Sequence, residues 1–148
     1  MKVSTKGRYG LRAIVDLAVN DGDGQVSLKS VAERQGLSEN YLEQLFSSLK
    51  KSGLVKSVRG AQGGYMLAKP ADNISVGDVL RSLEGTLCPV DCIDLESPIN
   101  CDRADLCVTA TVWAKLRDKI NEVVDSISIA DLVLEFEKKT KNDYIYYI

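Results

Sequence analysis

The chain has 148 residues and a formal net charge of −2, which is the size of one domain, or of a small domain with an oligomerising extension. It has no histidine, so a histidine-based hydrolytic triad, a histidine-ligated zinc site and a histidine pH switch are excluded, and we do not expect an enzyme. No apolar run reaches the ~18 residues of a membrane span, and no apolar signal core follows the N-terminus, so we expect a cytoplasmic protein without membrane association.

Charge is distributed unevenly along the chain. Residues 1–66 contain ten Lys or Arg and six Asp or Glu, a net charge of +4, whereas residues 67–148 contain nine and fifteen, a net charge of −6. A basic N-terminal half fits attraction to phosphate, and an acidic C-terminal half argues against uniform coating by nucleic acid.

The first predicted element is a helix over residues 4–20, with Ser4 or Thr5 as its cap. An apolar stripe at helical spacing predicts one buried face. The opposite side is basic and either contacts phosphates or forms a solvated face; its residues are Lys6, Arg8 and Arg12.

The next stretch predicts a helix-turn-helix. Ser27 caps a short helix over residues 28–34, and Gly36 supplies the turn after it. Ser38 caps a second helix that we expect to run to about residue 52. Its apolar residues recur at helical spacing and are expected to face inward: Leu42, Leu45, Phe46 and Leu49.

The outward face of this second helix carries side chains that read base edges in the major groove. Asn and Gln recognise adenine, and Glu accepts a hydrogen bond from the amino group of cytosine. The face consists of Asn40, Tyr41, Glu43, Gln44 and Ser47.

A hairpin is predicted next, from residues 54–58 and 65–67. The glycine-rich loop between them places Arg59 near its tip, where a long cation suits a narrow minor groove. An ordinary exposed hairpin is the alternative, but the position directly after a helix-turn-helix favours a wing. The predicted DNA-binding residues are therefore Ser38, Asn40, Tyr41, Glu43, Gln44 and Arg59.

Beyond the wing, Ser75 caps a short helix that Gly85 ends, and a long loop follows. Apolar periodicity returns from residue 108 with a two-per-heptad seam, which favours a helix that crosses to the same helix of a second subunit. The seam consists of Trp113, Leu116, Ile120, Val123 and Ile127. Residues 128–138 predict a further short helix, and the aromatic tail after it is expected to pack on the body or on a partner protein.

The expected architecture is thus mainly α with a small β-hairpin wing. Residues 1–85 form a winged helix-turn-helix domain, 86–107 a cysteine-containing loop, and 108–148 a dimerisation helix and tail. A homodimer would present two recognition helices to a roughly palindromic operator in double-stranded DNA.

The four cysteines are Cys88, Cys92, Cys101 and Cys107. Their confinement to one polar, acidic loop indicates metal or redox chemistry rather than a disulfide framework. An iron-sulfur cluster, a zinc site and a thiol switch all remain open, although only the first pair has the short spacing typical of zinc sites.

Several segments together resemble the family of the iron-sulfur cluster regulator IscR: residues 1–9, 37–45, 53–60 and 63–65. The resemblance extends over roughly residues 1–135 and implies a dimeric winged-helix transcription regulator with a 2Fe-2S cluster in the loop before the dimer helix. It assigns Cys92, Cys101 and Cys107 as ligands, but places Ala110 where the family has its fourth ligand, a histidine. Cys88, a carboxylate such as Asp91 or Asp102, or the other subunit would have to supply the fourth ligand.

The family's base-reading positions fall on Glu43 and Gln44, and its minor-groove wing residue on Arg59. The ending, residues 144–148, resembles instead that of CymR, a relative that represses cysteine metabolism, senses through a partner enzyme and carries no cluster. Because this chain has the cysteines that this relative lacks, we expect a repressor that senses cluster status and controls iron-sulfur assembly genes. The alternative is a cluster-free or zinc-binding repressor of cysteine or sulfur metabolism, regulated by a partner protein.

Overall fold

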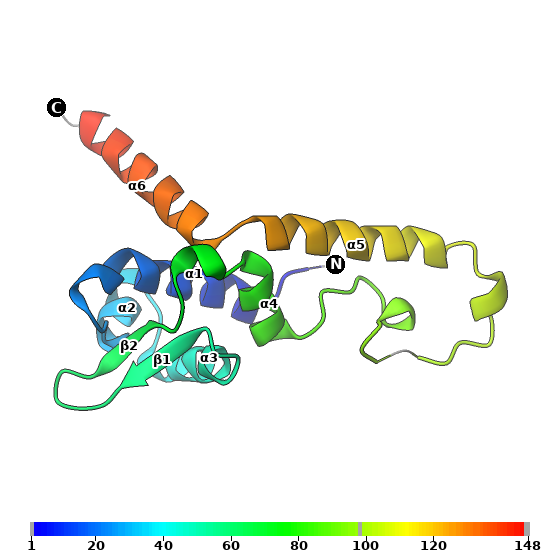
Figure 1. The fold of residues 1–148 in the computed structure, drawn as a ribbon, viewed down its shortest axis with the longest axis horizontal. Coiled ribbons are helices and arrows are strands. Elements are labelled where there is room, and N and C mark those ends of the chain that lie inside the picture. Colours follow the sequence, from blue (N-terminus) through cyan, green and yellow to red (C-terminus); the bar gives the residue numbers. More distant parts are fainter. Residues whose placement is uncertain (1, 98, 147–148) are drawn as a thin grey trace.

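The computed structural model describes residues 2–97 and 99–146. The helices are α1 (Thr5–Asn20), α2 (Leu28–Gln35), α3 (Glu39–Lys51), α4 (Val76–Glu84), α5 (Ala110–Ser126) and α6 (Ile129–Tyr146) (Figure 1). The strands are β1 (Val55–Val58) and β2 (Gly64–Leu67), and short 3₁₀ turns occur at Asp21–Asp23, Ala71–Asn73, Asp91–Ile93 and Ala104–Leu106. The predicted fold class, mainly helical with a winged helix-turn-helix, is confirmed.

The N-terminal body consists of α1 to α4 and the hairpin, packed around one hydrophobic core. α1 crosses the body and contacts α2, α3, α4, β2 and α6. Gly10 allows α1 to approach α4, because a Cβ at this position would collide with the side chain of Leu83. The largest fully buried side chains are Phe46, Ile14, Leu17, Leu42, Leu45, Leu49, Ile74, Ile129, Val31 and Val79.

Caps define where the helices begin. The hydroxyls of Ser4, Ser27 and Ser38 each accept a hydrogen bond from a backbone N–H in the first turn of the helix that follows. α4 begins with a full capping box, in which Ser75 and Asp78 each accept from the other's backbone N–H. Gly36 has a φ of 66°, which lets it end α2 in the left-handed conformation.

α5 extends away from the body, and the chain returns to the body at its C-terminal end (Figure 1). Arg81 of α4 holds this end: its guanidinium donates to Asp125 at 2.7 Å and to Asn121 at 2.8 Å. Two backbone hydrogen bonds of 2.8 Å fix the junction with α6, from Val76 N–H to the Ile127 carbonyl and from Ile129 N–H to the Ile74 carbonyl. The orientation of α5 is therefore set by polar contacts with α4.

The length of α6 differs from the predicted length. The sequence pattern predicted a short helix over residues 128–138, but α6 has 18 residues and ends at Tyr146. No glycine or proline occurs after residue 128, so nothing in the sequence stops the helix once it has begun. The expected packing of the aromatic tail, residues 144–148, concerns side chains outside those that the structure describes. Within the described residues, no helix is long and apolar enough to cross a membrane.

A buried carboxylate joins α1 to α2. Asp16 is 8% exposed and accepts from Arg34 at 2.6 Å and from the side-chain amide of Gln35 at 2.8 Å. The hydrogen bond from Arg34 to Asp16 raises the pKa of the Arg34 guanidinium. This contact holds the C-terminal end of α2, the first helix of the helix-turn-helix, against α1.

We expect Arg34→Ala to destabilise the protein by about 1.5–3 kcal/mol, because it leaves a buried carboxylate without its charged donor. Urea unfolding followed by circular dichroism measures the change. Lys29→Ala is the matched control, since Lys29 is exposed on the same helix, and it should change stability by less than about 0.5 kcal/mol. Equal stabilities of the two variants would contradict the role of Arg34.

Candidate nucleic-acid interface

The rotation of α3 about its axis is fixed by its buried face. Leu42, Leu45, Phe46 and Leu49 have no exposed area. Because a helix turns once in 3.6 residues, the polar positions between them are left on the opposite side. The exposed residues of this side are Asn40, Glu43, Gln44 and Ser47.

These four side chains lie in an open groove with residues from three other elements. Its lining residues are Lys6, Leu28, Asn40, Glu43, Gln44, Ser47, Ser48 and Tyr65. Lys6 comes from the first turn of α1 and Tyr65 from β2, so the groove joins a basic side chain to the polar face of α3. Donors and acceptors for base edges thus lie beside a cation that suits a phosphate.

Two of the predicted DNA-binding residues also have structural contacts. The Ser38 hydroxyl accepts from the backbone N–H of Tyr41 at 3.2 Å, which makes it the cap of α3. The Tyr41 ring is half-buried and meets the ring of Tyr9 edge-on, with the ring centroids 6.3 Å apart. Asn40, Glu43 and Gln44 are thus the members of the predicted set that the groove brings together.

The wing is an antiparallel pair of four-residue strands in which Val55 pairs with Leu67 and Val58 with Gly64. It is attached to the body on two sides. The ring of Tyr65 packs on Phe46 of α3 with the centroids 5.0 Å apart, and Tyr65 exchanges two backbone hydrogen bonds of 2.8 Å with Val26. Arg59 follows β1 directly and is exposed.

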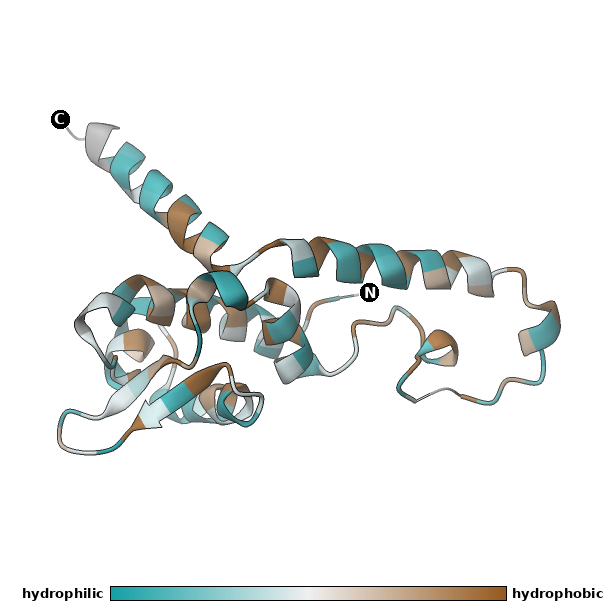
Figure 2. Cartoon of the chain, in the orientation of Figure 1, coloured by the Kyte–Doolittle hydropathy of each residue, from teal (hydrophilic) through white to brown (hydrophobic). Residues whose placement is uncertain are grey.

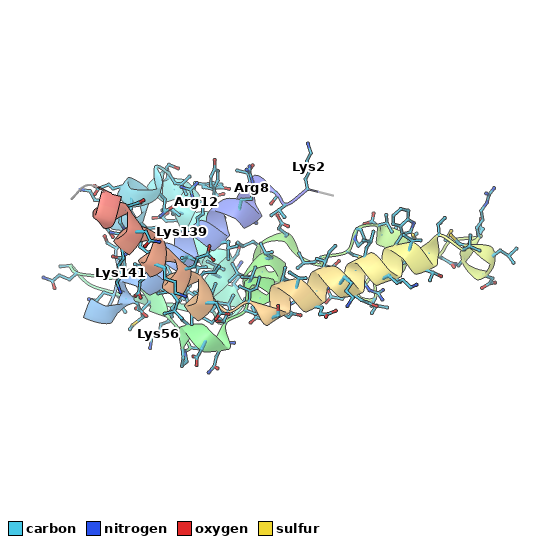
Figure 3. The ribbon with its side chains drawn as sticks, turned by 90° about the horizontal axis from the view of Figure 1, so that it is seen from above. Lys2, Arg8, Arg12, Lys56, Lys139 and Lys141 are labelled. Atoms are coloured by element: carbon cyan, nitrogen blue, oxygen red, sulfur yellow. The ribbon has the colours of Figure 1, made fainter. Side chains whose placement is uncertain are left out.

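The basic side chains of α1 have different environments. Lys6 lines the groove, whereas Arg12 lies over the Tyr9 ring and donates to the Gln35 side chain at 3.1 Å. Figure 3 shows Arg8 and Arg12 on α1, and Lys139 and Lys141 on α6. The sequence does not decide whether Arg8 and Arg12 contact phosphate. In the structure, the side chain of Arg12 points toward α2, where it donates to Gln35.

The local sequence does not indicate that Leu28, Ser48 and Tyr65 line the groove, or that Gln25 contacts the wing. It places Leu28 and Tyr65 only in their helix and strand. Their participation depends on how α2 and the wing pack beside α3, which no local pattern encodes.

The cysteine loop connects α4 to α5, and its described part contains only short 3₁₀ turns as regular structure. All four cysteines are free thiols; Cys92 and Cys101 are exposed, while Cys88 and Cys107 are half-buried. A hydrogen bond with the Thr109 hydroxyl, at 3.2 Å, and further bonds from backbone N–H groups lower the pKa of Cys107. Four thiols are a donor set that suits an iron-sulfur cluster, but among the described residues no three potential metal ligands are grouped closely enough to hold a metal ion.

One side of this loop is bound to α5. The Arg117 guanidinium donates to the Ile93 carbonyl at 2.7 Å, next to Cys92. A cavity of about 290 Å³ lies between α4, α5 and the loop, and its lining includes Arg81, Cys88, Asp94 and Arg117. The cysteine loop and the helix α5 are therefore in direct contact.

A polar recognition helix, a basic residue beside it and an attached wing define the class of a winged-helix DNA-binding protein. Residues 3–135 match the Rrf2 family, described as iron-dependent transcriptional regulators, and the chain belongs to that family. It is a DNA-binding transcriptional regulator and not an enzyme.

Two named groups of relatives are similar to the chain over nearly its whole length. The HTH-type transcriptional regulator CymR of Bacillus subtilis is 44% identical over 100% of both chains, and IscR of Yersinia enterocolitica is 41% identical over 97% of this chain and 88% of its own. Among solved structures, T. potens IscR has a TM-score of 0.76 with 52% identity, covering 94% of this chain and 90% of its own. CymR, the global cysteine regulator of B. subtilis, has a TM-score of 0.73 with 46% identity, covering 91% and 98%.

We expect Gln44→Ala to weaken specific operator binding by about 1–3 kcal/mol, because a good base contact contributes that much discrimination. Fluorescence anisotropy on a duplex selected by the intact protein measures the affinity. Asn73→Ala, a polar-to-alanine change at an exposed position outside the groove, should leave the affinity unchanged. An unchanged affinity of the Gln44 variant would remove this residue from the interface.

Proposed function

We propose that the protein is a homodimeric repressor that binds a palindromic operator and senses iron-sulfur cluster status through a bound 2Fe-2S cluster. Its targets would be genes for iron-sulfur cluster assembly. The observation that carries this proposal is the set of four free thiols in one loop that directly precedes α5 and is hydrogen-bonded to it through Arg117.

In this function the chain has three parts. Residues 1–85 bind DNA, residues 86–107 hold the cluster, and residues 108–148 form the dimer and the tail. Base contacts come from Asn40, Glu43 and Gln44, with Ser38 and Tyr41 at the start of the same helix. Arg59 enters the neighbouring minor groove. In a dimer, two such surfaces fit half-sites separated by one or more turns of about 34 Å.

Cys92, Cys101 and Cys107 would hold the cluster, with Cys88 as the fourth ligand in place of the histidine that this chain lacks. Thiolate is the usual ligand of such clusters, and Cys88 is half-buried in the cavity beside Arg117. A bound cluster would be lost under iron shortage or oxidation, so its loss would report either condition.

Contacts from the loop to the DNA-binding body provide a route for coupling. Arg117 binds the loop, the Asn121 side chain donates to the Arg117 carbonyl at 2.8 Å, and Arg81 of α4 binds both Asn121 and Asp125. A change in the loop would thereby alter the angle at which α5 leaves the body. The cluster shifts operator affinity only to the extent that it binds more tightly to one orientation of α5 than to the other.

The homodimer is proposed from the surface of α5, which has no buried residue in the described chain. Three of its apolar side chains are exposed on one side, with Val112 at 50%, Leu116 at 45% and Val123 at 56%. The hydropathy colouring places apolar segments along both α5 and α6 (Figure 2). A second α5 packed on this stripe would remove it from water.

We expect Leu116→Asp to weaken dimerisation by about 100-fold or more, because an unpaired charge buried in an apolar interface costs on the order of 3–5 kcal/mol. Sedimentation equilibrium measures the association. Thr111→Asp introduces the same charge at an exposed position on another side of α5 and should leave a dimer. A dimer that survives Leu116→Asp would exclude this stripe as the interface.

The cluster is tested by anaerobic purification with visible absorption and analysis of iron, sulfide and zinc. The intact protein should have charge-transfer bands and equal iron and sulfide. We expect Cys92→Ala to lose both while it still folds and dimerises, since Cys92 is exposed and outside the core. Cys88→Ala then distinguishes a thiol fourth ligand, which predicts loss of the cluster, from a carboxylate, which predicts retention. A Cys92 variant that unfolds would instead make the metal structural.

A second candidate function rests on the 44% identity to CymR over the full length of both chains. In that case the protein represses genes of cysteine or sulfur metabolism and responds to a partner protein, with the C-terminal tail as a candidate contact. A colourless protein that contains zinc, or no metal after anaerobic reconstitution, would favour this function over cluster sensing.

A further inference from the structure

The wing loop has a side-chain contact from outside the hairpin. The amide nitrogen of Gln25 donates to the backbone carbonyl of Gln62 at 2.7 Å, across 37 positions of sequence. Among the hydrogen bonds of the described residues, this is the one that joins the loop between β1 and β2 to a side chain outside the hairpin. Both glutamines are exposed, so the contact contributes little to the core.

The position of Gln25 is itself well determined. Its neighbour Val26 exchanges two backbone hydrogen bonds of 2.8 Å with Tyr65. A Cβ at Gly64 would collide with the Val26 carbonyl, so the segment before α2 lies directly against β2. The Gln25 side chain therefore extends from a fixed backbone to Gln62, which precedes Tyr65 by three residues.

The loop that receives this contact carries Arg59. It contains Gly60 with a φ of 125° and is closed by a hydrogen bond from Gly63 N–H to the Gly60 carbonyl at 3.0 Å. A loop rich in glycine loses conformational entropy when it is ordered on DNA. A contact that holds the loop before binding reduces this loss.

We propose that Gln25 is a positioning residue for DNA recognition, which preorganises the wing loop so that Arg59 is directed at the minor groove. The inference rests on the proposed role of Arg59. Gln25 acts through the loop rather than through a contact of its own with DNA, and the acceptor is a backbone carbonyl, so the side chain of Gln62 is not required.

A double-mutant cycle on the full-length protein tests the proposal. The probe is a duplex selected from a random pool by the intact protein, and anisotropy gives its affinity for Gln25→Ala, Arg59→Ala and the double variant. We expect Gln25→Ala to weaken binding about two- to tenfold, the effect of one neutral hydrogen bond. The double variant should bind as Arg59→Ala does, because Gln25 has nothing to position once the arginine is absent.

The matched control is Gln62→Ala, which keeps the backbone acceptor and should bind as the wild type does. Melting temperatures of all variants should coincide, since the residues are exposed. Additive losses, or an unchanged affinity of Gln25→Ala while Arg59→Ala is weakened, would overturn the positioning role and leave the wing contact intact. An Arg59→Ala protein of full affinity would overturn both, and failure to select any duplex would overturn the proposed operator binding itself.

Discussion

The candidate DNA-binding surface depends on the burial of one face of α3. Leu42, Leu45, Phe46 and Leu49 are fully buried, and each contributes on the order of 1.5–3 kcal/mol of transfer free energy. Rotation of the helix by even one residue would expose part of this face, so the polar residues Asn40, Glu43 and Gln44 have a fixed direction. Recognition chemistry is thereby separated from stability, because the exposed side chains contribute little to the core.

A second constraint concerns α5. This helix has no buried residue in the described chain, yet Arg81 fixes its end by charged hydrogen bonds to Asp125 and Asn121. Polar contacts thus orient the helix toward its own body and leave its apolar side free. The same helix binds the cysteine loop through Arg117. A change in the cysteine loop and the packing of a second subunit on the apolar side would therefore both act on α5.

Much of the body could be predicted because its signals are local. The serine caps, the glycine turn at Gly36 and the apolar spacing of α3 each arise within a few residues of one another. The predicted end of α6 was wrong because the apolar periodicity fades after Phe136, while no glycine or proline stops the helix before Tyr146. The salt bridge of Asp16 and the contact of Gln25 were not foreseen, since each joins residues 18 and 37 positions apart.

The sequence by itself determined the elements of the N-terminal body, the face of α3 that is polar, and the gathering of four thiols in one loop. These follow from composition and spacing, which act over one or two turns of chain. Only the tertiary structure decided that Lys6 joins the α3 groove, that Arg12 turns toward α2, and that the wing is held by Val26 and Gln25. Such contacts depend on how separate elements pack, and packing is the combined result of the whole core rather than of any single segment.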